Sequence, residues 1–143
     1  MVTSGIERLR KSDMKVAIKL FQKGLSLEVP PGKIEASAIK KELESTICYV
    51  HKTGNELDGL VNFKLNNSQN IRLMFICTTK LRKGIGSKLV SKVVAFGVKN
   101  RARWIYSYVS LKDKRAVNFY HSLGFRINTK TGHFGSYIRL KVA

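Results

Sequence analysis

The pattern of hydrophobic and polar positions predicts one strand and two helices near the N-terminus. Residues 5–10 alternate roughly, as in a short strand. Apolar residues recur every three or four positions from 14 to 21, which predicts an amphipathic helix that residues 12–13 cap and Gly24 ends. After the break at Pro30-Pro31-Gly32, residues 33–44 keep a helical pattern and predict a second helix.

Three segments rich in β-forming residues come next, with turn-forming residues between them. They cover residues 46–51, 60–65 and 71–78, and the second alternates between apolar and polar positions. In the third, residues 73–77 are all apolar, which is expected of a central strand buried on both faces. A meander of three strands is the simplest arrangement of these segments.

The C-terminal half predicts two more helices and three more strands. The expected elements are a loop at 80–86, a helix from Ser87, a strand at 104–110, a helix at 113–123 ended by Gly124, and strands at 125–128 and 136–142. The predicted order is β-α-α-β-β-β-α-β-α-β-β, without a linker. The sequence therefore indicates an α/β fold in a single domain over residues 1–143.

The charge of the chain is strongly unbalanced, with 27 Lys and Arg against 9 Asp and Glu and a net charge of +18. From Gly59 to the C-terminus, Asp113 is the only acidic residue. Such a surface attracts polyanions, so nucleic acid, a ribosomal surface and cofactor phosphates are candidate partners of this basic protein. The alternative is that the excess of lysine reflects only the proteome of the source.

Cysteine and histidine give no sign of a metal site. Cys48 and Cys77 lie in apolar, strand-like runs and are expected to be two buried thiols in a reducing compartment. No CxxC pair or His/Cys cluster occurs, and His51, His121 and His133 are scattered, so surface or half-buried roles are expected for them. The N-terminus has no apolar signal region and no run is long enough to span a bilayer, which favours a cytoplasmic protein without membrane contact.

The most informative stretch is a glycine-bearing loop between a buried strand and a helix. Backbone N–H groups at such a helix start are unpaired and the helix dipole adds positive potential, so the segment can cradle a pyrophosphate. It has neither the GxxxxGK spacing of a Walker loop nor a third glycine for a dinucleotide fold, and a tight strand–helix turn is the plain alternative. The residues of this cradle are Arg82, Lys83, Gly84, Ile85, Gly86 and Ser87.

Two motifs together resemble the GNAT superfamily of acetyltransferases. KLRKGIGSKLV is similar to the family's R/Q-x-x-G-x-G/A loop, and the run from Asp113 to Phe125, DKRAVNFYHSLGF, is similar to its second motif. The sequence departs from the family at Leu81, where Arg or Gln is usual, and at Asp113, where Asn is usual. The resemblance extends over the whole chain and implies the GNAT fold, with a mixed, mostly antiparallel central sheet and about four helices.

The resemblance also implies acetyl-CoA as cosubstrate, no metal, and transfer of the acetyl group to a primary amine. It gives Tyr120 the role of general acid for the leaving thiolate, whereas the plain alternative is an aromatic packed in the core. The backbone of Ile76, Cys77 and Thr78 corresponds to the segment that binds the pantetheine arm and polarises the thioester oxygen. Further residues of the second motif expected at the cofactor are Asp113, Arg115, Ala116 and Tyr120.

The general base is open, because residues 71–78 contain no carboxylate. Glu28 is the most suggestive candidate for a base or an acceptor-pocket residue, since the family's loop between the first two helices borders the acceptor. Glu35, Glu56 and Asp58 are further candidates, and each taken alone is expected to be a solvated surface carboxylate. A water relay, or an amine that arrives neutral, needs none of them.

The basic surface bears on the acceptor. It repels polycations and favours an amine presented by an acidic molecule or by RNA, such as an aminoacyl-tRNA, a ribosome-associated protein N-terminus or a protein lysine. The alternative function is a degenerate GNAT domain that binds nucleic acid or protein without turnover. Either a monomer or a homodimer joined through residues 136–142 is compatible with the sequence.

Overall fold

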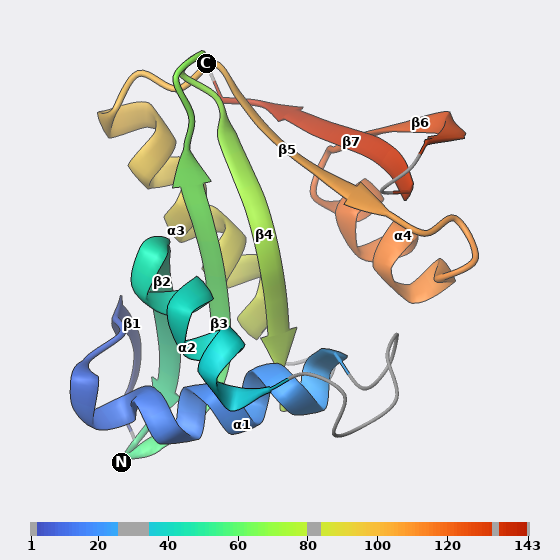
Figure 1. The fold of residues 1–143 in the computed structure, drawn as a ribbon. Helices are drawn as coiled ribbons and strands as arrows, with labels where there is room; N and C mark the ends of the chain where they lie inside the picture. Colours follow the sequence, from blue (N-terminus) through green and yellow to red (C-terminus); the bar gives the residue numbers. More distant parts are fainter. Residues whose placement is uncertain (1–2, 26–34, 80–83, 133–134, 143) are drawn as a thin grey trace. The chain divides into compact units, whose positions relative to one another are not determined.

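A computed structural model describes residues 3–25, 35–79, 84–132 and 135–142 (Figure 1). In these ranges it contains seven strands, four α-helices and one 3-10 turn, in the order that the sequence predicts. The elements are β1 (Ser4–Arg8), η1 (Lys11–Asp13), α1 (Met14–Leu25), α2 (Ala36–Ser45), β2 (Ile47–Thr53), β3 (Glu56–Leu65), β4 (Ile71–Thr78), α3 (Ile85–Lys99), β5 (Trp104–Val109), α4 (Lys114–Ser122), β6 (Arg126–Gly132) and β7 (Gly135–Lys141).

The strands form one sheet in the order β1-β2-β3-β4-β5-β7-β6. Antiparallel pairing joins β1 to β2, β2 to β3, β5 to β7 and β6 to β7. The parallel pair is β4 with β5, through Ile71 opposite Ile105 and Arg72 opposite Tyr106. The predicted mixed, mostly antiparallel sheet with four helices is therefore confirmed.

Contacts divide the chain into two compact units, and the expectation of a single domain stays a prediction. Unit 1 holds residues 1–63 and 74–92. In this unit α1 and α2 cover one face of β2 and β3 (Figure 1). The core between them is made of Ala17, Leu20, Phe21, Ile39, Leu43, Cys48, Val50, Leu57 and Leu60.

Unit 2 holds residues 64–73 and 93–143. Its core includes Ile71, Ile105 and Ile138, each with 0% of its surface exposed. The C-terminal half of α3 packs closely here, because a Cβ built on Gly97 would lie 3.2 Å from Ile71 Cδ1 and 3.3 Å from Val142 Cγ1. Gly97 thus permits the helix to approach the ends of β4 and β7.

Three local predictions need correction. Helix α3 begins at Ile85 rather than Ser87, so Gly86 lies in its first turn. Strand β3 begins at Glu56, four residues before the predicted start at 60, because the short turn at Gly54, φ 61°, lets pairing with β2 begin at once. In β4 only Leu73 of residues 73–77 is fully buried, and residues 74–77 are half-buried. The prediction of a strand buried on both faces is wrong for that segment.

A fourth difference is strand β6, which extends to Gly132, four residues beyond its predicted end at 128. The remaining boundaries lie close to the prediction. Helix α1 runs through Gly24 to Leu25, and α2 begins at Ala36 within the predicted 33–44 segment. Asp13 does not act as a simple cap, because its side chain accepts a hydrogen bond of 2.9 Å from Lys52 Nζ. None of the helices in the described ranges is both long and apolar enough to cross a membrane.

Candidate functional site

The turn between β4 and α3 has the geometry of an anion-binding helix start. Gly84 has φ +72° and open space where a side chain would lie. Its carbonyl accepts the Lys88 N–H at 3.0 Å, so the helical bonds begin there. The amides of Ile85, Gly86 and Ser87 precede the first intrahelical donor and point out of the helix end. The first turn of α3 carries no acidic residue, so the dipole potential is not neutralised by a carboxylate within that turn.

Other predicted residues of the cradle, Arg82 and Lys83, lie outside the described residues, as does Leu81. Lys88, one turn into α3, is exposed. The described part of the predicted cradle therefore consists of backbone groups at the start of the helix.

Gly59 on β3 packs directly against the first turn of α3. A Cβ built on Gly59 would lie 2.7 Å from Ile85 Cγ2 and 3.2 Å from Leu89 Cδ1. Ile85 and Leu89 are 5% and 0% exposed. The first turn of α3 is thus seated directly on the backbone of β3, in contact that any larger residue would disturb.

A β-bulge next to Gly59 places a buried carboxylate in the same region. The β2–β3 register shifts between His51, which pairs with Gly59, and Lys52, which pairs with Leu57. Leu57 and Leu60 therefore both enter the core under α1 and α2 although they are three residues apart. The extra residue is Asp58, which turns toward the β2 face that carries His51.

Asp58 is fully satisfied by hydrogen bonds. Its Oδ1 lies 2.5 Å from His51 Nδ1, and its Oδ2 accepts from Thr53 Oγ1 at 2.6 Å. Asp58 and His51 are 1% and 3% exposed. Burial alone would raise the pKa of Asp58, but the hydrogen bonds from Thr53 and His51 outweigh it and lower the pKa below its ordinary value.

The backbone of Asp58 also forms a hydrogen bond with the segment that leads to the start of α3. The Thr79 N–H donates to the Asp58 carbonyl at 2.9 Å. Thr79 follows the last residue of β4 and is the last described residue before residues 80–83. The bulge therefore holds β4 at its end, while Gly59 beside it supports the start of α3.

The predicted oxyanion and pantetheine segment, Ile76, Cys77 and Thr78, is half-buried. It is an apolar strand end that leaves surface accessible to a ligand. The Cys77 thiol donates to the Leu20 carbonyl at 3.7 Å. Burial raises the pKa of both Cys48 and Cys77 to about 12, so neither thiol is suited to act as a nucleophile.

Helix α4 presents the second motif. Asp113 is its N-cap, and the Asp113 carboxylate accepts the Ala116 N–H at 3.1 Å. Asp and Asn are both strong N-caps, which explains why Asp113 can stand where the family usually has Asn. Arg115 is exposed. Tyr120 is 8% exposed, and its ring lies 5.2 Å from the rings of both Phe119 and Phe125.

The candidate carboxylates differ clearly in their exposure to solvent. Glu28 lies outside the described residues. Glu35 is exposed at the start of α2 and Glu56 is exposed at the start of β3, as expected of surface carboxylates. For Asp58 the expectation of a solvated carboxylate is wrong, and for His51 the expectation of a surface or half-buried position is wrong. The bulge buries both residues and pairs them.

The sequence gives little warning of this buried pair. A bulge inserts a residue without a distinctive composition, and neither residue belongs to the two motifs. The aromatic side chains of β5, in contrast, can be predicted from the sequence. Trp104, Tyr106 and Tyr108 alternate along β5 with buried positions, as the run WIYSYV indicates. Among the described residues no three His, Cys, Asp or Glu side chains come together.

Comparison with known proteins identifies the family of the chain. The family model described as "Acetyltransferase (GNAT) domain" matches residues 16–135. No curated protein sequence matches the chain. Several hundred solved chains have a similar fold, among them a GNAT-family acetyltransferase from Staphylococcus aureus Mu50, at 15% identity and a TM-score of 0.82, with 99% of this chain and 100% of that chain covered.

Two further solved structures have a similar fold. The yncA protein of Salmonella typhimurium, solved with acetyl-CoA, is 13% identical with a TM-score of 0.80, covering 99% and 95% of the two chains. The ribosomal-protein-S18-alanine N-acetyltransferase of Escherichia coli is 14% identical with a TM-score of 0.79 and the same coverage. At these identities the likeness establishes the fold. Because the family model covers residues 16–135, the chain belongs to the GNAT acetyltransferase family and is an N-acetyltransferase.

Proposed function

We propose that this chain transfers the acetyl group of acetyl-CoA to a primary amine. The observation that carries the proposal is the helix start at Gly84–Ser87, where unpaired amides and a positive-φ glycine offer space and potential for a pyrophosphate. Among proteins with this fold, yncA from Salmonella typhimurium was solved with acetyl-CoA and a Thermoplasma acidophilum acetyltransferase with coenzyme A.

The described residues fit this ligand. Gly84 leaves open space at the helix end, and Lys88 is exposed in the next turn. The half-buried apolar segment 74–77 suits the uncharged pantetheine arm, which needs apolar contact and backbone hydrogen bonds rather than ions. Bound acetyl-CoA supplies the activated thioester, and the chain's own residues bind and orient it.

The roles follow from what amide formation requires. The backbone of Ile76, Cys77 and Thr78 polarises the thioester carbonyl oxygen of acetyl-CoA through N–H donation. Tyr120 protonates the leaving thiolate, and its ring is fixed by Phe119 and Phe125. Asp58 is not the general base, because both of its oxygens accept internal hydrogen bonds and it is 1% exposed. Glu28 or a water relay fills that role, or an amine that arrives neutral makes a base unnecessary.

The acceptor is an amine presented by an acidic molecule or by RNA, as the basic surface favours. A protein N-terminus, a protein lysine and an aminoacyl-tRNA are the acceptor classes of this proposal, and the cytoplasm is the proposed compartment. The Escherichia coli relative that acetylates a ribosomal-protein alanine gives one example of such an acceptor on this fold.

Thermal melting with acetyl-CoA tests the ligand directly. At about 100 times its Kd a ligand adds about 2.7 kcal/mol to the free energy of unfolding. For a chain of this size that amounts to a shift of several degrees in Tm. Wild-type protein that shows no shift at millimolar acetyl-CoA contradicts the proposal.

A pair of variants at one position provides the control. Gly84→Asp and Gly84→Asn have the same shape and the same backbone strain at φ +72°, and they differ in one negative charge. We expect Gly84→Asp to lose acetyl-CoA binding and Gly84→Asn to keep a measurable part of it. Equal loss in both variants argues against a pyrophosphate at this helix start. Release of coenzyme A across a panel of amines, peptides and aminoacyl-tRNA then separates an enzyme from a binding module.

A further inference from the structure

One face of the β5–β7 pair in unit 2 carries aromatic and cationic side chains at adjacent positions. Trp104 lies opposite Lys141, Tyr106 opposite Arg139, and Tyr108 opposite Tyr137. Alternation puts all of these side chains on the same face. We call it the aromatic–cationic face, and its members are Trp104, Tyr106, Tyr108, Tyr137, Arg139 and Lys141.

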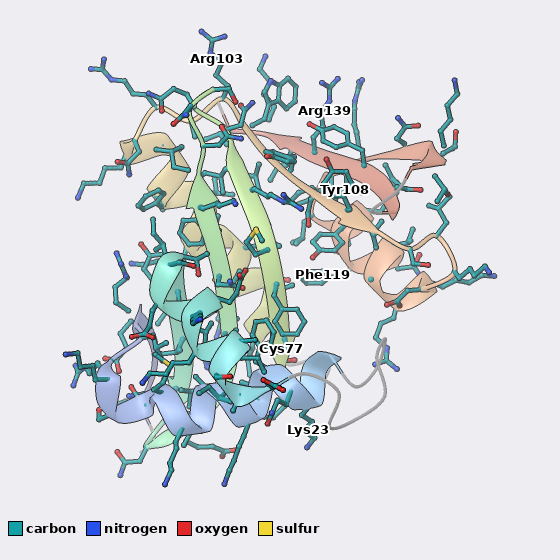
Figure 2. The ribbon with its side chains drawn as sticks, viewed as in Figure 1. Lys23, Cys77, Arg103, Tyr108, Phe119 and Arg139 are labelled. Atoms are coloured by element: carbon teal, nitrogen blue, oxygen red, sulfur yellow. The ribbon has the colours of Figure 1, made fainter. Side chains whose placement is uncertain are left out.

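This face is accessible to solvent. Its six residues are half-buried or exposed, whereas the intervening residues Ile105, Ser107 and Val109 are buried. The other side of β5 therefore packs in the core, and this side leaves aromatic surface available. Figure 2 labels Tyr108 on β5 and Arg139 on β7. An accessible cluster of aromatic rings on a sheet is uncommon without a ligand, because it leaves apolar area in water.

The rings and guanidinium groups already stack on one another. Tyr106 and Tyr108 each lie 5.8 Å, centroid to centroid, from Tyr137. The Arg139 guanidinium carbon lies 4.3 Å from the centre of the Trp104 ring, and the Arg72 carbon lies 5.5 Å from that of Tyr108. Aromatic faces and guanidinium planes are the surfaces on which unpaired bases stack.

The charge around this face is one-sided. Unit 2 contains twelve Lys and Arg and a single acidic residue, Asp113, which caps α4. On β6, Arg126 lies directly opposite Arg139 of β7. Like charges at opposed positions destabilise a sheet, and an anion bound between them relieves the repulsion. Repulsion between these two arginines thus destabilises this part of the sheet, and a bound polyanion would reduce that repulsion.

A basic hollow of about 450 Å³ continues from one end of the face. It shares Trp104 and Lys141 with the face and adds Arg101 and Arg103, which are both exposed. Arg101 has φ 58°, a left-handed conformation that costs energy for a non-glycine residue. Side chains that could contact consecutive phosphates therefore lie beside the aromatic rings.

We propose that the aromatic–cationic face and this hollow bind a single-stranded nucleic acid. Bases stack on Trp104 and the tyrosines, while phosphates contact Arg139, Lys141 and the arginines of the hollow. A duplex hides the faces of its bases, and an acidic peptide such as polyglutamate has no aromatic rings to stack, so neither uses the rings. The inference goes beyond acetyl transfer and does not depend on it.

The fluorescence of Trp104 tests the proposal in the unmodified protein, because it is the only tryptophan of the chain. Single-stranded RNA and DNA of one mixed sequence, about ten nucleotides long, are titrated at about 50 mM salt and at higher salt. We expect quenching, and a log–log salt slope of about −0.7 per phosphate contacted. The difference between the RNA and DNA arms identifies the preferred sugar.

Several outcomes overturn the proposal. They are no binding of single strands at low salt, binding without any change in Trp104 emission, tighter binding of the matched duplex, and equal binding and quenching by polyglutamate. Acetyl-CoA melting is measured on the same protein, so a failed nucleic-acid result is distinguishable from a failure of the cofactor proposal.

Variants locate the site. Arg139→Gln with Lys141→Gln should reduce the salt slope by about 1.4 and the affinity at low salt by tenfold or more. Tyr108→Leu should lower affinity by about tenfold through lost stacking. The matched control is Lys15→Gln with Lys19→Gln, which removes two exposed charges from α1 in unit 1. If the control lowers affinity as much as the β7 pair, net charge alone explains binding and the site is refuted.

Discussion

His51 and Asp58 form a buried pair, 2.5 Å between Nδ1 and Oδ1, on the strand backbone that supports the start of α3. His51 lies opposite Gly59, which contacts Ile85, and the Asp58 carbonyl holds Thr79. One β-bulge thus supports both described edges of the proposed phosphate-binding segment. The catalytic residues of the proposal do not include this pair, so we expect it to position the backbone of the proposed cofactor site.

Replacing Asp58 with Asn should destabilise the fold by about 1–3 kcal/mol, because the amide cannot accept on both sides and leaves the His51 ring or the Thr53 hydroxyl poorly satisfied in a buried position. Urea unfolding measures the loss. Glu44→Gln is the matched control, since Glu44 is an exposed carboxylate on α2 and should change the free energy of unfolding by less than about 0.5 kcal/mol. A similar small change in Asp58→Asn would show that the pair does not stabilise the hairpin.

The contribution of Asp58 should depend on pH in a defined direction. The Asp58 pKa is lowered in the folded protein, chiefly because hydrogen bonds from Thr53 and His51 outweigh the effect of burial. The stabilisation is therefore complete above the unfolded pKa, about 3.9, and is lost as pH falls through the lower folded value. The stability gap between wild type and Asp58→Asn should stay constant between about pH 6 and pH 5 and narrow as the pH falls below about 4. A gap that widens on acidification contradicts the assignment.

Gly59→Ala tests the link between the bulge region and the cofactor site. The new methyl would stand 2.7 Å from Ile85 Cγ2 and 3.2 Å from Leu89 Cδ1, so the Ile85 side chain or the first turn of α3 that carries it must shift. Overpacking of this kind costs about 1–3 kcal/mol. We expect a weaker Kd for acetyl-CoA at temperatures where the variant is fully folded. Gly5→Ala is the control, because no atom lies within 4 Å of a Cβ there and β1 should accept it.

The motifs predicted the fold well because they depend on local chemistry. Gly84 needs a positive φ, Asp113 caps a helix, and Gly124 ends it at φ 92°, and each of these requirements is visible in neighbouring residues. The start of helix α3 was harder to predict. Gly86 suggests a loop by propensity, yet seating Ile85 on Gly59 extends the helix by tertiary packing.

Long-range pairings could not be read in the same way. The contact of Asp58 with His51 depends on a register shift, which no composition specifies. The basic residues after Gly59 belong to two different units and environments, which a count of charges does not reveal. Lys92 lies 5.8 Å from the Tyr49 ring centre in unit 1, whereas Lys99, Arg101 and Arg103 are exposed in unit 2. Only the strand register showed that cations and aromatic rings share one face of β5 and β7.

Neither thiol should react readily in the folded protein. Burial raises the pKa of Cys48 and Cys77 to about 12, so at about pH 8 only about one thiol in ten thousand is ionised. A thiol reagent such as DTNB should label the native chain slowly and both cysteines quickly in concentrated urea. Acetyl transfer should survive native treatment with the reagent. Fast labelling of Cys77 with loss of activity would instead indicate a thiol at the catalytic centre.

Tyr120→Phe separates a general acid from a core aromatic. The substitution keeps the ring between Phe119 and Phe125 and removes only the hydroxyl, so Tm should fall by no more than the few degrees that one lost hydrogen bond costs. If Tyr120 protonates the leaving thiolate, kcat and kcat/KM should fall together by about 10²–10⁴-fold, while the Kd for acetyl-CoA stays constant. Tyr49→Phe is the matched control, since Tyr49 is equally buried, 9% against 8% exposed, and has no proposed role in the reaction. A fall in Tm with unchanged kcat would make Tyr120 a packing residue, and would assign protonation of the thiolate to water. Equal loss of kcat in both variants would point to packing as well, because the hydroxyl of Tyr49 has no route to the reacting thioester in the proposal.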